Sequence, residues 1–235
     1  MMKALVLLSG GQDSTTCLYW ALDKTHIFNG VRAISFDYGQ KHKIEIQKAE
    51  EIALKAGVEW ILLEAPKMYG TSPLVNSDEA VGNYNSVEEL PEGIEPTFVP
   101  ARNIIFLTMA VNFALSKGIY QIVTGVCQVD YGGYPDCRAG FISSMQSALN
   151  VGIFGHAYRH TNIHKQIKIH TPLMYLTKKE IVLFAKDLNC IDALADTHTC
   201  YEGLNPPCGK CHSCLLRERG FKEAGIEDPL MKGEK

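Results

Sequence analysis

Short apolar runs and helix-like segments alternate along the chain. Apolar runs of strand length occur five times, at residues 2–8, 31–37, 58–63, 119–126 and 167–173. Helix-like segments follow them, at residues 14–23, 41–56, 101–117, 139–150 and 177–188, with a short one at about 213–224. Because strands and helices alternate, we expect an α/β fold, a doubly wound parallel sheet of five strands with helices on both faces.

The segment 64–100 interrupts this alternation. It contains five prolines and shows little periodicity. A connection of this length within a compact domain is either a disordered surface insertion or a functional loop. We hypothesise that it forms a lid over a substrate.

The composition bounds the class of protein. The chain has 235 residues, 46% of them hydrophobic and 21% charged, which fits a globular protein of one domain or one domain with a small appendage. The net charge of −3 does not favour binding to a nucleic-acid backbone, and no basic face for a membrane is indicated. We recognise no signal peptide and no apolar stretch of membrane-spanning length, so we expect a cytoplasmic protein.

Four of the eight cysteines are clustered, at Cys200, Cys208, Cys211 and Cys214. Without a secretion signal, a metal site is favoured over disulfides. Four thiolates can surround one tetrahedral Zn²⁺, and because sulfur would fill every position the ion would be structural. An Fe–S cluster also uses four cysteines, and the spacing alone does not exclude it. Unrelated buried cysteines are a third interpretation.

Other candidate metal ligands are weaker. The histidines His156, His160 and His164 have the spacing of one helix face, with His170 further on, but Thr161 and Asn162 weaken that helix. We therefore do not expect them to bind a metal. Cys127 and Cys137 are interpreted as packing cysteines.

A glycine loop follows the first predicted strand, with the sequence Ser9-Gly10-Gly11-Gln12-Asp13-Ser14. Glycines let the backbone approach an anion closely, and the start of the next helix adds N–H groups and a partial positive charge. The loop therefore predicts a phosphate site, at which Asp13 suits a bridging Mg²⁺. It is not a Walker A motif, which needs a lysine after its second glycine. A plain turn is the alternative.

Charged residues also stand at the starts of two helices, near expected strand ends. Arg102 and Asn103 open the longest helix and can face an anion. Lys178 follows Thr177, which forms a capping-box pattern with Glu180, and it can hold a phosphate group as a point charge. Ordinary solvent exposure is the alternative for both cations.

A polar loop at residues 129–138 follows the fourth predicted strand. Ligands of open parallel sheets bind beyond the carboxyl ends of the strands. A carboxylate there suits the N–H donors of a guanine-like ring, and a tyrosine can stack on such a ring. The candidate residues are Asp130, Tyr134, Asp136 and Arg138.

The glycine loop resembles the PP-loop of the ATP pyrophosphatase superfamily, whose members split ATP between the α and β phosphates and transfer AMP to a substrate. Over nearly its whole length the chain resembles one family within it, the 7-cyano-7-deazaguanine synthase (QueC) family. The matching stretches are residues 9–18 (SGGQDSTTCL), 36–40 (FDYGQ), 97–100 (TFVP), 103–104 (NI), 124–127 (TGVC), 133–138 (GYPDCR), 171–174 (TPLM) with Lys178, and 199–201 (TCY) with the three closing cysteines. GYPDCR combined with the cysteine cluster is far more specific than the loop alone.

The resemblance implies an adenine nucleotide alpha hydrolase-like fold. Residues 1–190 would form a PP-loop nucleotide-binding α/β domain, and residues 191–235 a zinc-binding region. The implied activity is that of an AMP-forming carbon–nitrogen ligase. It would convert 7-carboxy-7-deazaguanine, ammonia and two ATP to 7-cyano-7-deazaguanine, a queuosine precursor, through an amide. Structural Zn²⁺, Mg²⁺ and ATP are implied, as is a homodimer.

The site residues carry over position by position as implications of the resemblance. The nucleotide-binding PP-loop corresponds to Leu8, Ser9, Gly10, Gly11, Gln12, Asp13, Ser14, Thr15, Thr16, Cys17 and Leu18. The zinc ligands correspond to Cys200, Cys208, Cys211 and Cys214. Beyond what the resemblance implies, we hypothesise that Asp13, Arg102 and Lys178 are catalytic, because they handle phosphate charge, and that residues 36–39 flank the adenine. We also hypothesise that the deazaguanine is bordered by Asp130, Tyr134, Asp136 and Arg138.

The chain departs from the family pattern at three places. Ala101 stands where the family often has glycine between proline and arginine. The gap between Cys200 and Cys208 is one residue shorter than usual, and residues 154–166 are longer than usual and rich in histidine. The last departure leaves local substrate or subunit contacts open.

Two other functions stay open at this point. The first is that of a sister PP-loop enzyme, either one that stops at the amide or a tRNA-modifying thiolase or amidase. A thiolase needs a catalytic cysteine pair, for which Cys127 and Cys137 are the candidates. The second is a non-enzymatic zinc module that binds nucleic acid, which the net charge of −3 and the intact PP-loop disfavour.

Overall fold

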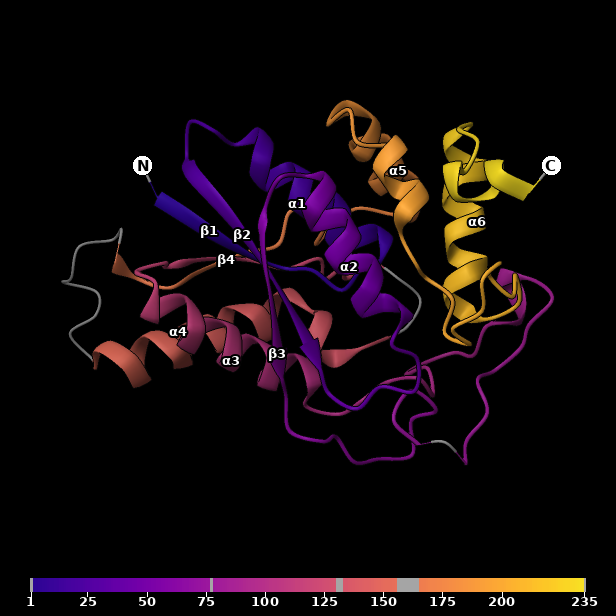
Figure 1. The fold of residues 1–235 in the computed structure, drawn as a ribbon. Helices are drawn as coiled ribbons and strands as arrows, with labels where there is room; N and C mark the ends of the chain where they lie inside the picture. The colour runs from indigo at the N-terminus through magenta and orange to yellow at the C-terminus, as the bar shows by residue number, and fades with distance from the viewer. Residues whose placement is uncertain (1, 77, 130–132, 156–164, 235) are drawn as a thin grey trace.

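The computed structural model describes residues 2–76, 78–129, 133–155 and 165–234. Its centre is one sheet of five parallel strands in the order β3-β2-β1-β4-β5 (Figure 1). The strands are β1 (Met2–Leu7), β2 (Phe28–Asp37), β3 (Glu59–Glu64), β4 (Gln121–Val123) and β5 (Lys168–His170). Because β1 lies in the middle, the loop that follows it opens at the centre of the carboxyl edge, where the strand order reverses.

Helices cover both faces of the sheet (Figure 1). On one face lie α1 (Gln12–Asp23) and α2 (Ile44–Lys55), and on the other lie α3 (Arg102–Ser116) and α4 (Ala139–Phe154). Successive residues of β1 point to opposite faces, so Val6 packs with the first pair of helices and Leu5 with the second. Both are completely buried, as expected for a parallel sheet that is covered on two sides.

The last two helices pack beside this sandwich. They are α5 (Lys178–Asp187) and α6 (His212–Ala224), and they share an apolar cluster formed by Val182, Ala185, Cys190, Leu194 and Phe221. At their crossing Gly220 leaves no room for a side chain, because a Cβ there would lie 2.9 Å from Cβ of Lys178. Helix α6 therefore packs directly on α5. The separate status of residues 191–235 as a zinc-binding region stays a prediction.

Short 3₁₀ helices complete the described chain, at Val87–Glu89, Pro135–Cys137, Asp192–Asp196 and Pro229–Glu234. The first belongs to the long connection after β3, which runs from the sheet toward the start of α6 (Figure 1). The backbone N–H of Tyr84 donates to the carbonyl of Lys210 at 2.9 Å, and Val81 packs against the clustered cysteines. These contacts fix the connection at two points, and its action as a lid stays a prediction.

The α/β fold and its five parallel strands are confirmed. Two predicted strands are longer than the observed ones, since β4 and β5 each pair over only three residues. After Val123 the chain bends past the glycine loop, where a Cβ on Gly125 would lie 3.0 Å from the amide nitrogen of Ser14. Among the described residues no helix has the length and apolar character needed to cross a membrane.

Candidate active site

The loop after β1 is closed by its own hydrogen bonds. The Ser14 hydroxyl accepts from the Ser9 amide at 3.1 Å and donates to the Gly11 carbonyl at 3.1 Å. Gly10 has a φ of 81°, and a Cβ there would lie 2.4 Å from the Glu45 carbonyl oxygen in α2. Only glycine fits this position, because both the backbone angle and the space exclude a side chain.

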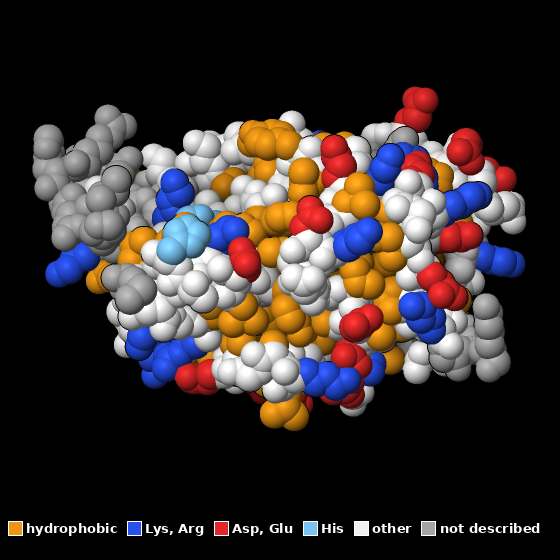
Figure 2. Space-filling view, turned by 90° about the horizontal axis from the view of Figure 1, so that it is seen from above, with side chains coloured by type: hydrophobic (Ala, Val, Ile, Leu, Met, Phe, Trp, Pro, Cys, Tyr) orange, Lys and Arg blue, Asp and Glu red, His pale blue; other side chains and the backbone are white. Residues whose placement is uncertain are grey.

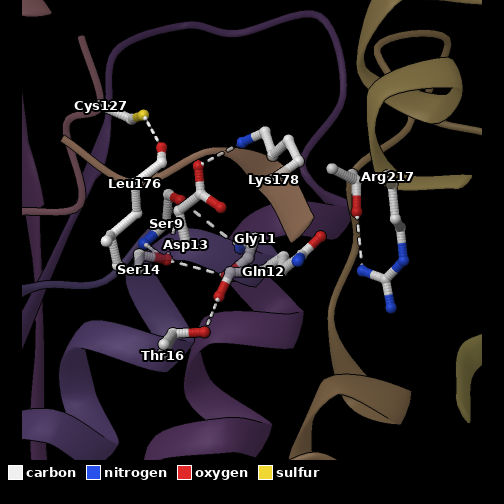
Figure 3. Close-up of polar contacts among 11 residues, drawn as sticks. Ser9, Gly11, Gln12, Asp13, Ser14, Thr16, Cys127, Leu176, Lys178 and Arg217 are labelled. Atoms are coloured by element: carbon white, nitrogen blue, oxygen red, sulfur yellow. Dashed lines mark hydrogen bonds and ion pairs between the residues drawn. The ribbon is translucent and has the colours of Figure 1, made fainter. Parts of the chain in front are cut away.

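An ion pair stands at the mouth of this loop. Nζ of Lys178, the first residue of α5, lies 2.7 Å from Oδ2 of Asp13 in the first turn of α1 (Figure 3). The start of α5 is fixed by a capping box, in which the Thr177 hydroxyl accepts from the Glu180 amide and the Glu180 carboxylate accepts from the Thr177 amide. The capped helix thus directs the lysine at the loop.

A cavity of about 340 Å³ extends from this pair along the carboxyl edge of the sheet. This volume is within the range of small-molecule sites. One of its walls includes Arg102, the first residue of α3, together with Glu45 and Tyr134. Burial raises the pKa of Glu45 to about 7, against the opposing effect of Arg102.

Tyr134 is held by a buried polar network at this wall. Its hydroxyl lies 2.6 Å from the Thr97 hydroxyl, and the Thr97 amide donates to the Glu95 carboxylate at 2.8 Å. Burial raises the pKa of Tyr134 to about 12, so the phenol stays protonated and keeps an O–H to donate. The long connection after β3 therefore supplies part of the support for the cavity wall.

The third wall comes from the end of the chain. The His198 amide donates to the Gly10 carbonyl at 2.8 Å, which joins residues far apart in sequence. Thr199 and His212 line the cavity on this side. Behind them Arg217 is buried and pairs with Asp228, its Nε 2.6 Å from Oδ2.

The four clustered cysteines form a compact set beside this wall. Their sulfur atoms all lie within 4.8 Å of one another, and Sγ of Cys208 is 3.9 Å from Sγ of Cys214. A tetrahedral ion with metal–sulfur bonds of about 2.3 Å needs sulfur separations of about 3.8 Å. The residues present therefore fit a structural metal site in which no position is left for a substrate.

These features were compared with known proteins. The sequence model of the family described as "Queuosine biosynthesis protein QueC" matches residues 3–225. The chain belongs to the QueC family. A "7-cyano-7-deazaguanine synthase" from Gloeobacter violaceus is 48% identical over 241 residues, covering 100% of this chain and 98% of the relative. One of the same name from Chromobacterium violaceum is 44% identical over 230 residues, covering 98% and 93%.

One solved structure aligns with this QueC-family chain at much lower similarity. It is titled "U34-tRNA thiolase NcsA from Methanococcus maripaludis with its 4Fe-4S cluster", and it has 18% identity and a TM-score of 0.47. The alignment covers 99% of this chain and 67% of that chain. A likeness at this level carries no inference about function.

The predicted PP-loop residues divide into two groups in this QueC-family chain. Those that line the cavity are Leu8, Ser9, Gly11, Gln12, Asp13 and Ser14. Three others support the loop conformation. Gly10 adopts the backbone angle that the loop requires, and the hydroxyls of Thr15 and Thr16 donate to the Gly11 and Gln12 carbonyls. Cys17 and Leu18 are completely buried in the core.

The predicted catalytic and substrate residues are partly brought together. Asp13, Lys178 and Arg102 line one cavity, as do Tyr134 and Arg138. Asp136 is buried beside α3 instead, where its carboxylate accepts from the Asn103 amide at 3.4 Å.

Several predictions fall on residues without a described structure. Asp130 is outside the described residues, and so are His156, His160 and His164. His170 is described and is partly buried, with Nε2 2.9 Å from Oε1 of Gln121.

Sequence reasoning missed residues that reach the cavity from other elements. Glu45 comes from α2, and His198, Tyr201 and His212 come from the end of the chain. Tyr38, which was predicted to flank the adenine, also lines the cavity. Nothing local in the sequence indicates that His212 faces the loop at residues 9–14, because only the packing of α6 brings the two together.

Proposed function

We propose that this chain is an AMP-forming ligase that converts 7-carboxy-7-deazaguanine and ammonia to 7-cyano-7-deazaguanine, a precursor of queuosine. The names of its relatives in the QueC family support the substrate. The observation that carries the proposal is the single cavity lined by the glycine loop, the Asp13–Lys178 pair and Arg102.

The reaction requires two activations. A carboxylate is a poor electrophile, so its oxygen first attacks the α-phosphorus of ATP and pyrophosphate leaves. Ammonia then attacks the acyl carbon, a proton is lost, and AMP departs with the bonding electrons to give the amide. The amide oxygen is adenylated by a second ATP in the same way. The adenylated amide loses one proton from nitrogen, and departure of AMP with loss of the second proton leaves the nitrile.

The residues of the cavity suit the charge that these steps develop. The loop at residues 9–14 would hold the triphosphate through its N–H groups and hydroxyls. Lys178 and Arg102 would stabilise charge on the phosphates. Asp13 and the phosphates would together bind a Mg²⁺ ion, and this ion neutralises phosphate charge when bound. Residues 36–39 would flank the adenine. The main contribution of the protein is therefore positioning and electrostatic stabilisation.

The deazaguanine would lie toward the opposite wall. Tyr134 can stack on the ring, and Arg138 lines the same part of the cavity, where its guanidinium donates to the Gln128 carbonyl. We assign Asp130 and Asp136 to the same border, the first for its acceptor oxygens and the second through its hold on the start of α3.

We assign Zn²⁺ to the four clustered cysteines, because their geometry leaves a closed set of thiolates. Reduced thiolates suit a cytoplasmic protein. We also propose the division into residues 1–190 and 191–235, and a homodimer that sedimentation velocity would detect as twice the chain mass. A monomer at micromolar concentration would contradict the last assignment.

The decisive experiment is a mass-spectrometric assay of the purified protein with 7-carboxy-7-deazaguanine, ammonium and Mg-ATP. We expect nitrile and two AMP per nitrile. Accumulation of amide with AMP would indicate the sister activity, and absence of turnover would make the substrate assignment wrong. Binding of tRNA in a filter assay would favour the tRNA-modifying alternative.

A matched pair of variants tests the assignment of Asp13. Asp13→Ala should lose turnover, whereas Asp23→Ala, at the exposed end of the same helix, should keep it. Full turnover by Asp13→Ala would overturn the assignment.

A further inference from the structure

Two buried polar side chains line the cavity and have polar atoms without a hydrogen-bond partner among the described residues. His212 is 4% exposed, and neither of its ring nitrogens has a hydrogen-bond partner among the described residues. Gln12 is 3% exposed, and its Nε2 likewise finds no partner in the part of the chain that the structure describes. Both residues line the cavity of the candidate active site. Buried polar groups are almost always satisfied, so a molecule in the cavity is expected to complete them.

The positions of these residues indicate the charge of that molecule. Four helices present their first residue to the same cavity: Gln12 of α1, Arg102 of α3, Lys178 of α5 and His212 of α6. A helix N-terminus carries unsatisfied N–H groups and a partial positive charge. Two of the four first residues are cations as well. The cavity is therefore built for an anion of several oxygens.

The residues that line the cavity differ between its two ends. Gln12 adjoins Asp13, to which Lys178 is paired, and α6 packs on α5 through Gly220. His212 opens that α6 helix and lines the same cavity as the glycine loop. Aromatic residues such as Phe36 and Tyr38 line the part reached from β2. The oxygens nearest His212 are then those of phosphates rather than of a base.

We propose that His212 donates a ring N–H to a β- or γ-phosphate oxygen of bound ATP, beside Lys178. The segment that carries the four cysteines then has a second role besides holding a metal, because it places a ligand-binding side chain directly after Cys211. This inference rests on the proposed function, since it takes ATP as the anion.

The test measures equilibrium binding by calorimetry with the full chain, using Mg²⁺ and either AMP or an ATP analogue with a methylene bridge between the α and β phosphates. His212→Leu keeps an apolar volume and removes the N–H, and His212→Gln keeps a donor. We expect His212→Leu to weaken analogue binding about tenfold or more, with AMP binding changed less than about twofold. His212→Gln should recover part of the loss. Lys210→Ala, exposed in the same loop, should match the wild type.

The metal content of each variant is measured alongside, so that damage to the cysteine set is seen separately. Equal affinity of His212→Leu and the wild type for the analogue would overturn the proposal. An equal loss for the analogue and for AMP, or a loss in His212→Gln as large as in His212→Leu, would overturn it too. A wild-type protein that binds neither nucleotide would instead overturn the proposed function, and this inference with it.

Discussion

Ala101 occupies a backbone conformation that favours glycine. Its φ is 64° and its ψ 3°, in the left-handed region, and it is the residue that precedes α3 and Arg102. A side chain in this region costs about 1–2 kcal/mol. The family often has glycine at this position. Alanine in its place therefore lowers the stability of the folded backbone locally, directly before Arg102.

We therefore expect Ala101→Gly to stabilise the protein by about 0.5–1 kcal/mol, because relief of the strained backbone exceeds the extra entropy of the unfolded chain. Urea denaturation measures the change. The control is Ala195→Gly, exposed in the 3₁₀ helix Asp192–Asp196, which should destabilise by about 0.5–1 kcal/mol. Equal destabilisation by both changes would contradict the argument.

His170 gives the stability a defined pH dependence. Its partly buried ring packs against Trp20 and Phe28, and burial, aided by Lys168, lowers its pKa to about 4. Between about pH 6.5 and pH 4 the unfolded chain binds a proton that the folded chain does not. The free energy of unfolding therefore falls as the pH drops through this window, by up to about 3 kcal/mol from this residue.

The prediction concerns the difference between variants. The wild type should lose more stability than His170→Gln between pH 6.5 and pH 4 in urea titrations, while His26→Gln, at an exposed position, should follow the wild type. Parallel curves for the wild type and His170→Gln would make the assignment wrong.

At the scale of elements, the start of α5 couples local structure to the site. The capping box of Thr177 and Glu180 holds the first turn, and Lys178 is the first residue of that turn. Thr177→Ala should cost about 1 kcal/mol of stability and weaken ATP binding, since the lysine is then less well oriented. The matched change is Thr108→Ala, exposed within α3, whose hydroxyl donates to the Ile104 carbonyl. It should be nearly neutral in both measurements, and a similar loss of ATP affinity in both variants would contradict the coupling.

Elements with strong local patterns were predictable from the sequence. The strands β1, β2 and β3 and the capped α5 agree with prediction to within a few residues. The ends of β4 and β5 were not predictable, because apolar residues continue beyond the point where the strands stop pairing. Their limits depend on how the chain bends around the glycine loop, which is a tertiary effect.

The same distinction applies to the site. The glycine loop and the cysteine cluster are contiguous in sequence, so their residue types and spacing predicted them. Glu45 and His212 are single residues on helices, and only the packing of α2 and α6 brings them to the cavity. No periodicity or spacing distinguishes them from ordinary surface residues.

At the scale of the whole molecule, the cysteine set links three segments. Cys200, Cys208, Cys211 and Cys214 cluster with Val81 from the long connection, and Cys214 lies in the first turn of α6. We expect one Zn²⁺ per chain in elemental analysis. Removal by a chelator should increase amide hydrogen exchange at residues 198–214 and 79–90 and leave α4 unchanged. Iron, no metal, or unchanged exchange would contradict this prediction.

One face of the molecule carries charges of both signs. On the face that Figure 2 shows, Lys and Arg side chains are interspersed with Asp and Glu, and no large area of one sign is present. This face therefore offers no continuous electrostatic footprint for a phosphate backbone. This agrees with the net charge of −3.

The hydrogen bond from the His198 amide to the Gly10 carbonyl has a consequence for the newly made protein. Ribosomes deliver the chain from its N-terminus, so the glycine loop emerges first, and domains generally begin to fold in that order. The third wall of the cavity, which residues 198–217 supply, emerges only after most of the chain has been translated. A nascent chain therefore cannot complete the candidate site until residues 198–217 have been translated.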